Sequence, residues 1–345
     1  MRPLGLELDY PLIQSPMAGV QDIELAVAVT AAGGLGSLPA AMLSSSQLDQ
    51  SLSQFRQRLN GPINVNFFCH RSPQEDQRFS PTWLSALQPF FDEFEIDSAS
   101  IASGAERRPF SDEACEVLEH YRPEVVSFHF GLPRAELVDR VHGMGSLIAV
   151  TATTVEEARW LQAHGADLII AQGLEAGGHR GHFLSSGLTQ QLPMEELLHQ
   201  CLGAIDLPVI AAGGIGDSKQ VKRCFDIGAS AVQVGTAFLL CDEATTSDVH
   251  RRALTADAGE KTCITNVFSG RPARGIVNRA IQALGPMSAV APAFPQAATA
   301  ITALRQKCEA QDSGDFSPLW SGQNTRGCEA VAASEIVRRL MESNH

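Results

Sequence analysis

The stretch EAGGHRG at residues 175–181 places a titratable imidazole, His179, directly behind two glycines, Gly177 and Gly178. Glycine lets a backbone approach a ligand closely, and histidine is the side chain that exchanges protons near neutral pH. On a polar, glycine-rich loop, burial for packing is not the obvious purpose of the ring. The stretch therefore predicts a reactive loop in which His179 transfers a proton.

A second histidine, His129, ends an apolar run in VSFHFG between two phenylalanines. Two interpretations stay open for it, a hydrogen-bonded core residue or a group in the active site. His182 lies three residues beyond His179, with Glu175 near. The two glycines interrupt any helix that would bring these side chains together, so we expect no metal site.

Schiff-base and metal chemistry would need lysines, paired carboxylates or H-x-H clusters at the ends of the apolar runs, and the sequence has none there. The lysines, which would supply a Schiff base, all lie elsewhere: Lys219, Lys222, Lys261 and Lys307. No pair of carboxylates and no H-x-H cluster ends an apolar run either. A Schiff-base aldolase and a metal-dependent hydrolase are therefore disfavoured.

Eight short apolar runs must position these groups, and each alternates with a helical pattern. The runs begin at Pro11, Leu35, Ile63, Val125, Leu147, Leu168, Val209 and Ala231. Gly165 and Gly228 have the place of helix C-caps just before a strand. Such alternation predicts parallel strands with helical crossovers. Without a G-x-G-x-x-G after the first strand, it favours a TIM (β/α)8 barrel over a doubly wound sheet.

Barrel enzymes act at the carboxyl ends of their strands, so the residues that end the runs are the candidate site. Besides the two histidines and the glycines before His179, they are Met17, Ala18, Gly19, Asn66, Gln172, Gly213, Gly214, Gly235 and Thr236. The last four follow the seventh and eighth runs, where barrels commonly bind a phosphate with backbone N–H groups.

An apolar side chain with two amides, Met17 with Asn66 and Gln172, suits the polar edge of a flat heteroaromatic ring. Flavin mononucleotide (FMN) fits both this set and the phosphate turns. The alternative is that Met17 belongs to the core and both amides cap loops.

Three regions follow from this organisation. We expect an FMN-binding barrel over residues 1–240, and a helical lid or substrate insertion on its C-terminal side over 241–300, where Pro, Ala and Gly accumulate. Helices over 301–345 are expected to return to the barrel.

Composition narrows the class of protein. The 345 residues carry 39 acidic and 26 Lys and Arg side chains, a net charge of −13 with no basic stripe, so a nucleic-acid partner is not expected. The eight cysteines include no C-x-x-C pair, and no apolar run has the length of a membrane span or a signal peptide. We expect a soluble, cytoplasmic protein with no membrane partner.

Taken together, the segments SPMAGV, AAGGLGSL, VSFHFGLP, AQGLEAGGHRG, VIAAGGI, QVGTAFL and LWSGQ resemble the class I nitronate monooxygenases, formerly called 2-nitropropane dioxygenases. The resemblance runs from about residue 11 to residue 323. One departure is that the family has a Thr-Pro shortly after its first-strand glycine, where this chain reads VQDIELA.

The resemblance implies an FMN enzyme that oxidises alkyl nitronates, such as propionate 3-nitronate, with O2 to a carbonyl compound and nitrite. It implies FMN contacts from the strand-end residues named above. His179 would be the catalytic base, and His129 would help to hold the nitro group or the flavin. The expected partners are the small nitronate and O2, in a monomer or homodimer.

Three alternatives stay open. The same barrel serves FMN-dependent NAD(P)H reductases of the enoyl-thioester or quinone type, which share the glycine-histidine loop. The others are a flavin-storage protein and a flavin-free isomerase of a phosphorylated substrate. We further hypothesise that Arg180, or Arg271 and Arg274 in SGRPARG, clamps an anionic substrate.

Overall fold

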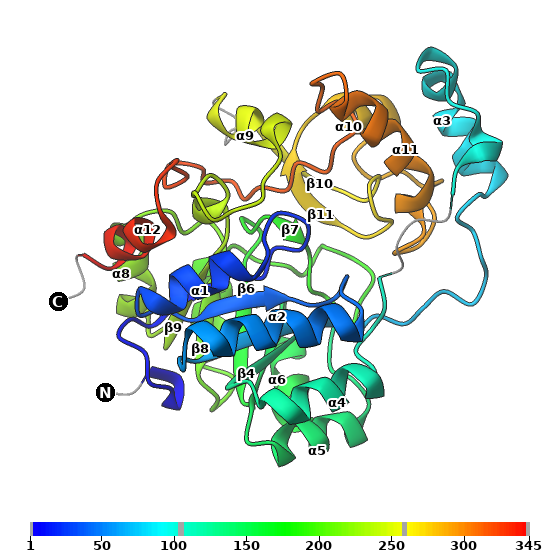
Figure 1. Cartoon of the computed structure of the whole chain (residues 1–345). Coiled ribbons are helices and arrows are strands. Elements are labelled where there is room, and N and C mark those ends of the chain that lie inside the picture. The colour runs from blue at the N-terminus through cyan, green and yellow to red at the C-terminus, as the bar shows by residue number, and fades with distance from the viewer. Residues whose placement is uncertain (1–2, 103–106, 257–260, 343–345) are drawn as a thin grey trace.

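Eight parallel strands form a barrel at the centre of the computed structural model, which describes residues 3–102, 107–256 and 261–342 (Figure 1). The strands are β1 (Leu12–Gln14), β2 (Gly36–Pro39), β3 (Ile63–Phe68), β4 (Val125–His129), β5 (Leu147–Ala152), β6 (Leu168–Gln172), β8 (Val209–Ala212) and β9 (Ala231–Val234). Their order is β1-β9-β8-β6-β5-β4-β3-β2, and a parallel bridge between Ile13 and Leu35 joins the two edges. These are the eight apolar runs, so the predicted TIM barrel is confirmed.

A ring of helices surrounds the barrel, and all but the last, which follows β9, connect successive strands. It consists of α1 (Ile23–Ala31), α2 (Ser45–Arg58), α4 (Asp112–Tyr121), α5 (Ala135–Gly143), α6 (Val155–Ala163), α7 (Met194–Leu202), α8 (Ser218–Ile227) and α12 (Ala333–Met341). Several of these helices begin with a side-chain cap, from Asp22, Ser44, Ser111, Thr154 and Asp217. At the other end of α8, Gly228 is the C-cap at a φ of 121°, and Gly165 follows α6 at a φ of 99°.

Two long excursions leave the ring and pack on each other. The one between β3 and α4 carries α3 (Pro81–Glu93) and a 3-10 turn, η2 (Ser98–Ser100). The one between β9 and α12 carries η3 (Thr236–Phe238), α9 (Asp248–Thr255), β10 (Thr262–Thr265), β11 (Ala273–Ile276), α10 (Arg279–Leu284) and α11 (Ala297–Glu309). A core that includes Trp83 and Phe91 of α3 and Leu304 of α11 is separate from the barrel core. Figure 1 shows α3, α10 and α11 gathered on one side of the barrel.

The second excursion differs in part from a helical insertion, because it contributes two strands. β10 and β11 form an antiparallel sheet of order β10-β11-β7, in which β7 (Gly178–His179) is the stretch singled out from the sequence. His179 pairs with Ala273, and Gly178 pairs with Arg274. The excursion is thereby hydrogen-bonded to the histidine loop. The division at residues 240 and 300 stays a prediction.

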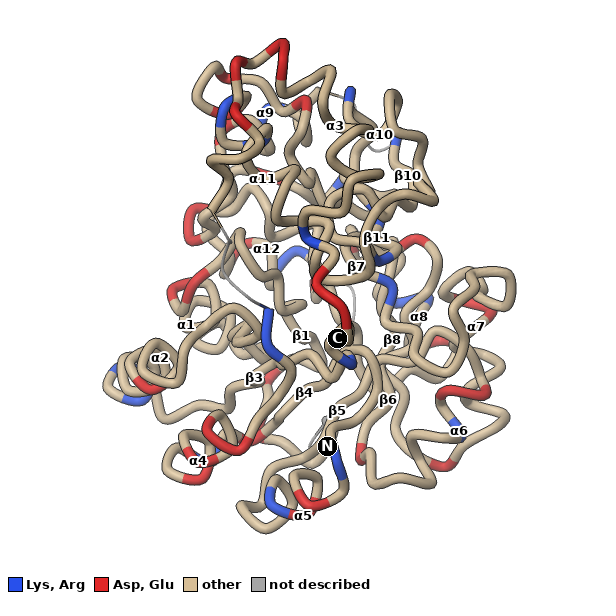
Figure 2. The backbone as a smooth tube through the Cα atoms, turned by 90° about the vertical axis from the view of Figure 1, so that its right-hand side faces the viewer, with Lys and Arg blue, Asp and Glu red and all other residues tan. Residues whose placement is uncertain are grey.

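Charges are spread along the chain. Figure 2 shows acidic and basic positions interspersed over the barrel helices and the excursions. Within the described residues, no helix has both the length and the apolar character that a membrane span needs.

Candidate active site

A cavity opens where the barrel strands end, and nearly all of the predicted site residues line it. They are Met17, Ala18, Asn66, His129, Gln172, Gly177, Gly178, His179, Gly213, Gly214, Gly235 and Thr236. Gly19 does not line the cavity. It lies at a φ of 88° in the turn that the Val20 N–H closes on the Met17 carbonyl at 3.3 Å.

The His179 ring lies among aromatic side chains. Its centroid is 5.4 Å from that of Phe294, 5.5 Å from Trp320, 6.0 Å from Phe130 and 6.2 Å from Phe68. Burial lowers the pKa of His179 well below its ordinary value, and the positive charge of Arg107 lowers it further. The imidazole is therefore neutral at pH 7 and able to accept a proton.

A hydroxyl, rather than a carboxylate, orients this ring. His179 Nε2 lies 2.8 Å from Ser269 Oγ, and the Ser269 hydroxyl donates to the Arg271 carbonyl at 3.3 Å. In that arrangement Ser269 accepts a hydrogen bond from Nε2–H, which leaves Nδ1 as the nitrogen with a free lone pair. Nδ1 makes no hydrogen bond with a described residue, so it is the nitrogen open to a substrate proton.

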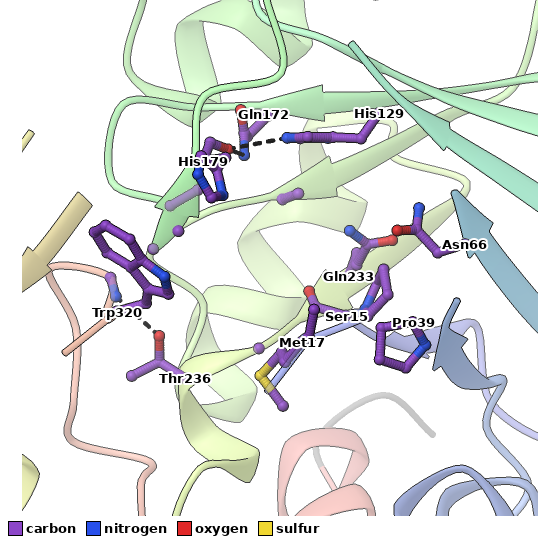
Figure 3. A pocket seen from close by; sticks show the side chains of 18 of the residues that line it. Ser15, Met17, Pro39, Asn66, His129, Gln172, His179, Gln233, Thr236 and Trp320 are labelled. Atoms are coloured by element: carbon purple, nitrogen blue, oxygen red, sulfur yellow. Dashed lines mark hydrogen bonds between the residues drawn. The ribbon is translucent and has the colours of Figure 1, made fainter. Parts of the chain in front are cut away.

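His129 and Gln172 hold the backbone of His179, and both bonds are drawn in Figure 3. His129 Nε2 lies 3.1 Å from the His179 carbonyl, and Gln172 Nε2 donates to the same oxygen at 2.9 Å. Because a carbonyl only accepts, Nε2 of His129 carries the proton, and Nδ1 faces Thr151 Oγ1 at 3.0 Å. Burial lowers the pKa of His129 to about 3. A neutral ring with both nitrogens engaged positions the loop and is poorly placed to exchange protons itself.

Both polar atoms of the Gln172 amide bond to the same loop, since its Oε1 also accepts from the Gly181 N–H at 2.9 Å. The Asn66 amide donates to Ser127 Oγ at 2.9 Å, and its oxygen remains available. Near it, the Oε1 atom of Gln233 is buried without a hydrogen-bond partner among the described residues. Figure 3 shows Gln233, Asn66 and Ser15 close together on one side of the cavity. This edge of the cavity can accept hydrogen bonds from a ligand.

The arginines of the histidine loop and of SGRPARG donate hydrogen bonds to backbone carbonyls. Arg180 is completely buried and donates to Gln172 O, Gly173 O and Gln191 Oε1 at 2.7–2.9 Å. Arg271 donates to the His182 carbonyl, and Arg274 donates to the Leu174 carbonyl at 2.8 Å.

None of these three arginines lines the cavity. The hypothesis that they clamp an anionic substrate is therefore wrong. Each of the three donates to a carbonyl oxygen that its loop would otherwise leave unpaired. Glu175 has a similar part, since it accepts from the first N–H of α7, at Met194, at 2.9 Å.

The glycine turns after β8 and β9 have a shape suited to an anion. Gly213 and Gly214 have φ values of 123° and 72°, which L side chains rarely adopt. A C-terminal segment covers these turns: Asn324 Nδ2 donates to the Gly214 carbonyl, and Gly322 N–H donates to Thr236 Oγ1, both at 2.9 Å. Backbone N–H groups at such turns bind phosphate in many proteins.

The same segment explains one of the glycines before His179. A Cβ on Gly177 would lie 2.5 Å from the Gly322 nitrogen, so residue 177 must be glycine for the chains to pack. Gly178 differs, because a Cβ there would meet no atom within 4 Å, although its φ of 72° still favours glycine.

Other residues of the site were not predicted from the sequence. Arg107, Gln233, His250 and Trp320 line the cavity, and Ser269 contacts His179. Gln233 carried a signal, as a polar residue inside an apolar strand. The other four lie on the excursions, where nothing in the local sequence places them at the barrel mouth. Within the described residues, no group of three or more His, Cys, Asp or Glu side chains forms a metal site.

The family model described as nitronate monooxygenase matches residues 5–343. The chain belongs to the nitronate monooxygenase family. It is 37% identical over 343 residues to the nitronate monooxygenase of Pseudomonas aeruginosa, covering 99% of this chain and 97% of that protein. It is also 37% identical to the nitronate monooxygenase of Paraburkholderia phytofirmans, over 97% of this chain and 92% of that protein.

Solved structures agree with this membership. The nitroalkane oxidase from Streptomyces ansochromogenes is 36% identical, with a TM-score of 0.89 over 97% of this chain and 96% of that one. FabK from Thermotoga maritima is 23% identical, with a TM-score of 0.68 over 98% of this chain and 93% of that one, and at that identity it shows the fold alone. This member of the nitronate monooxygenase family is therefore an oxidoreductase on a TIM barrel.

Proposed function

We propose that this chain is an FMN-dependent nitronate monooxygenase that oxidises alkyl nitronates, including propionate 3-nitronate, with O2 to carbonyl compounds and nitrite. The observation that carries the proposal is that His179, a neutral histidine whose carbonyl is held by His129 and Gln172, lies in one cavity with the paired glycine turns, in a chain of this family. Family membership alone gives the class of reaction. The residues that line the cavity support the assignment of roles proposed below.

FMN suits the groups that line the cavity. The family is in general one of flavin enzymes, and the turns at Gly213–Gly214 and Gly235–Thr236 would bind a phosphate through backbone N–H groups. The buried, unpaired Oε1 of Gln233 is an acceptor that a ring N–H would satisfy. When bound, FMN supplies the electron acceptor for oxidation of the nitronate.

His179 is the catalytic base in this proposal. A carbon beside a nitro group is acidic because the anion delocalises onto the nitro oxygens, so a neutral imidazole is a sufficient base. Nδ1 of His179 takes the proton from that carbon of a neutral nitroalkane, and the nitro group keeps the electron pair of the C–H bond. A substrate that arrives as the nitronate needs no base. His129 acts through the His179 carbonyl and is a positioning residue.

The test uses purified protein, its cofactor identified by mass, and O2 uptake with ethyl nitronate and propionate 3-nitronate. The proposal expects FMN, nitrite release and turnover, and no bleaching of the flavin by NADH without O2. Bleaching by NADH with no nitronate turnover would instead establish the reductase alternative.

The residue assignment needs a matched pair of histidine variants. His179→Asn is expected to keep activity with the nitronate and to lose at least about 100-fold in kcat/KM with neutral nitroethane, since general-base catalysis contributes about 10²–10⁴-fold. The control is His164→Asn, at an exposed histidine just after α6, and it is expected to leave kcat/KM unchanged with both substrates. Equal loss with both substrates in His179→Asn would exclude the role of base.

A further inference from the structure

One charged side chain of the described residues faces the cavity, and none of those residues supplies a counter-ion for this cation. Among the described residues that line the cavity, Arg107 is the only Lys, Arg, Asp or Glu. Burial lowers the pKa of Arg107, as does the charge of Arg305, and no carboxylate acts in the opposite direction. No ion pair or side-chain hydrogen bond joins its guanidinium to a described residue.

A half-buried, unpaired guanidinium is costly to a fold. Desolvation penalises the charge, and no hydrogen bond to the guanidinium and no opposite charge from the described part of the chain compensates for it. Arg180, by contrast, donates to two backbone carbonyls, and Arg271 donates to the His182 carbonyl, although the Nε of Arg271 is buried without a partner among the described residues. Arg107 thus differs from these two arginines in that no described residue accepts a hydrogen bond from its guanidinium, and an anion in the cavity would supply the partner.

The position of Arg107 separates it from the phosphate turns. Its segment is fastened to the end of β3, where the Phe110 N–H donates to the Phe68 carbonyl at 2.8 Å, and the Phe68 ring lies 6.2 Å from that of His179. The glycine turns follow β8 and β9, and β8 lies opposite β3 in the strand order of the barrel. An anion bound by Arg107 would therefore lie beside His179 rather than at the phosphate turns.

We propose that Arg107 recognises the substrate anion, by binding the nitro-group oxygens of the nitronate through its guanidinium. The planar fork of N–H donors matches two oxygens on one atom, as it does with carboxylates. This inference rests on the proposed function and deepens it, because it makes the anionic nitronate, rather than a neutral nitroalkane, the favoured ligand of the cavity.

The same charge also acts on the base. The titratable and charged groups that bear on His179 are Arg107, His129, Arg271 and His70, and each lowers its pKa. Removing the guanidinium therefore raises the pKa of His179. The acid limb of the kcat/KM profile for neutral nitroethane then moves to higher pH, because imidazole is protonated earlier as the pH falls.

The experiment compares the FMN-loaded wild type with Arg107→Met, Arg107→Lys and the control Arg108→Met. Arg108 is the exposed neighbour, so its variant loses the same charge outside the cavity. In Arg107→Met, KM for ethyl nitronate is expected to rise roughly 10- to 100-fold, with kcat changed far less, since the interaction exists already in the ground state. Arg107→Lys keeps the charge and is expected to be intermediate in KM, with the acid limb near that of the wild type.

A binding assay separates this inference from the proposed function. Sodium nitrate, an inert planar anion, is titrated while the flavin absorbance is followed. The wild type is expected to bind nitrate at least about 10-fold more tightly than Arg107→Met, as for a lost charge-assisted contact.

Three results would overturn the inference. They are equal nitrate affinity in wild type and Arg107→Met, no nitrate binding to the wild type, and a KM effect confined to propionate 3-nitronate, which would assign Arg107 to the remote carboxylate. Absence of turnover with any nitronate in the wild type would end the proposed function, and the nitrate titration would still decide the role of Arg107. Because removing an unpaired cation relieves a desolvation cost, Arg107→Met is expected to fold, with its FMN content and circular dichroism as checks.

Discussion

The substitution Glu157→Gln tests how the chain after His179 is held. Glu157, in the first turn of α6, is 1% exposed. Its Oε1 accepts from the N–H groups of Phe183 and Leu184 at 2.6 and 3.3 Å, and its Oε2 accepts from Thr153 N and Oγ1 at 2.7 and 2.8 Å. One buried carboxylate thus joins the end of β5 to the loop that follows the histidine.

The amide of glutamine cannot accept hydrogen bonds from all four donors, because only one of its two polar atoms is an acceptor. If its NH2 group faces Phe183 and Leu184, two backbone donors lose their acceptor. If it faces Thr153, the hydroxyl can turn to accept, and only the Thr153 N–H is left unpaired. The second arrangement is the less costly. An unpaired buried N–H costs about 1–3 kcal/mol, and the two remaining bonds lose their charge assistance, so we expect a loss of about 2–5 kcal/mol in the free energy of unfolding.

Urea unfolding of the holoenzyme, followed by circular dichroism, measures this loss. Glu156→Gln is the matched control, since Glu156 is the exposed neighbour on the same helix turn and a surface change is expected to stay within about 0.5 kcal/mol. Hydrogen exchange in a peptide covering residues 180–186 should increase only in Glu157→Gln. Equal unfolding free energies for the two variants, within about 0.5 kcal/mol, would refute the reasoning.

Three further predictions concern the same region. Thr151→Val should lower the free energy of unfolding by about 1–3 kcal/mol, because it leaves Nδ1 of the half-buried His129 without its partner; unchanged stability in urea would contradict that bond. Gly177→Ala should cost about 1–3 kcal/mol through the 2.5 Å contact with the Gly322 nitrogen, whereas Gly187→Ala, whose nearest contact is 4.0 Å, should cost far less; similar melting temperatures would exclude the close packing. Acid should destabilise the fold from pH 6.5 downward, because several histidines become protonated in the unfolded chain at a pH where they stay neutral in the folded protein. The folded pKa is lowered to about 4 for His70, His182 and His250 and to about 3 for His129, so each contributes a loss on the order of 2 kcal/mol by pH 5; a free energy of unfolding unchanged between pH 7 and pH 5 would contradict this.

The barrel was predictable because its strands are buried on both faces and read as continuous apolar runs. INVNFF and LIIAQ are buried at every residue, and this pattern has no counterpart in a solvent-facing strand. The excursions lacked such a signal. β10 reads TCIT and is only partly buried, so its pairing with β11 depends on contacts that the local sequence does not encode.

The candidate site divides along the same line. Residues at strand ends were found, because a parallel barrel brings the carboxyl ends of all strands to one mouth. Arg107 and Ser269 were missed, since they reach the mouth from excursions whose positions are set by tertiary packing. For His129 the sequence left two interpretations open, a hydrogen-bonded core residue or a group in the active site. The structure combines them, because the half-buried ring bonds to Thr151 and to the His179 carbonyl and so positions the histidine loop.

The distribution of charge around His179 explains what kind of base it can be. Carboxylates near the loop accept from backbone N–H groups, as Glu157 does from Phe183 and Glu175 from Met194. No carboxylate hydrogen-bonds to either ring nitrogen of His179 within the described residues, in contrast to catalytic triads, where an acid stabilises the imidazolium. An imidazole without such support, beside a cation, protonates weakly. It can deprotonate only a carbon that is already acidic, and the surrounding charge favours substrates that arrive as anions. On the proposed function, these electrostatics suit a substrate that arrives as the nitronate, because that anion needs no base.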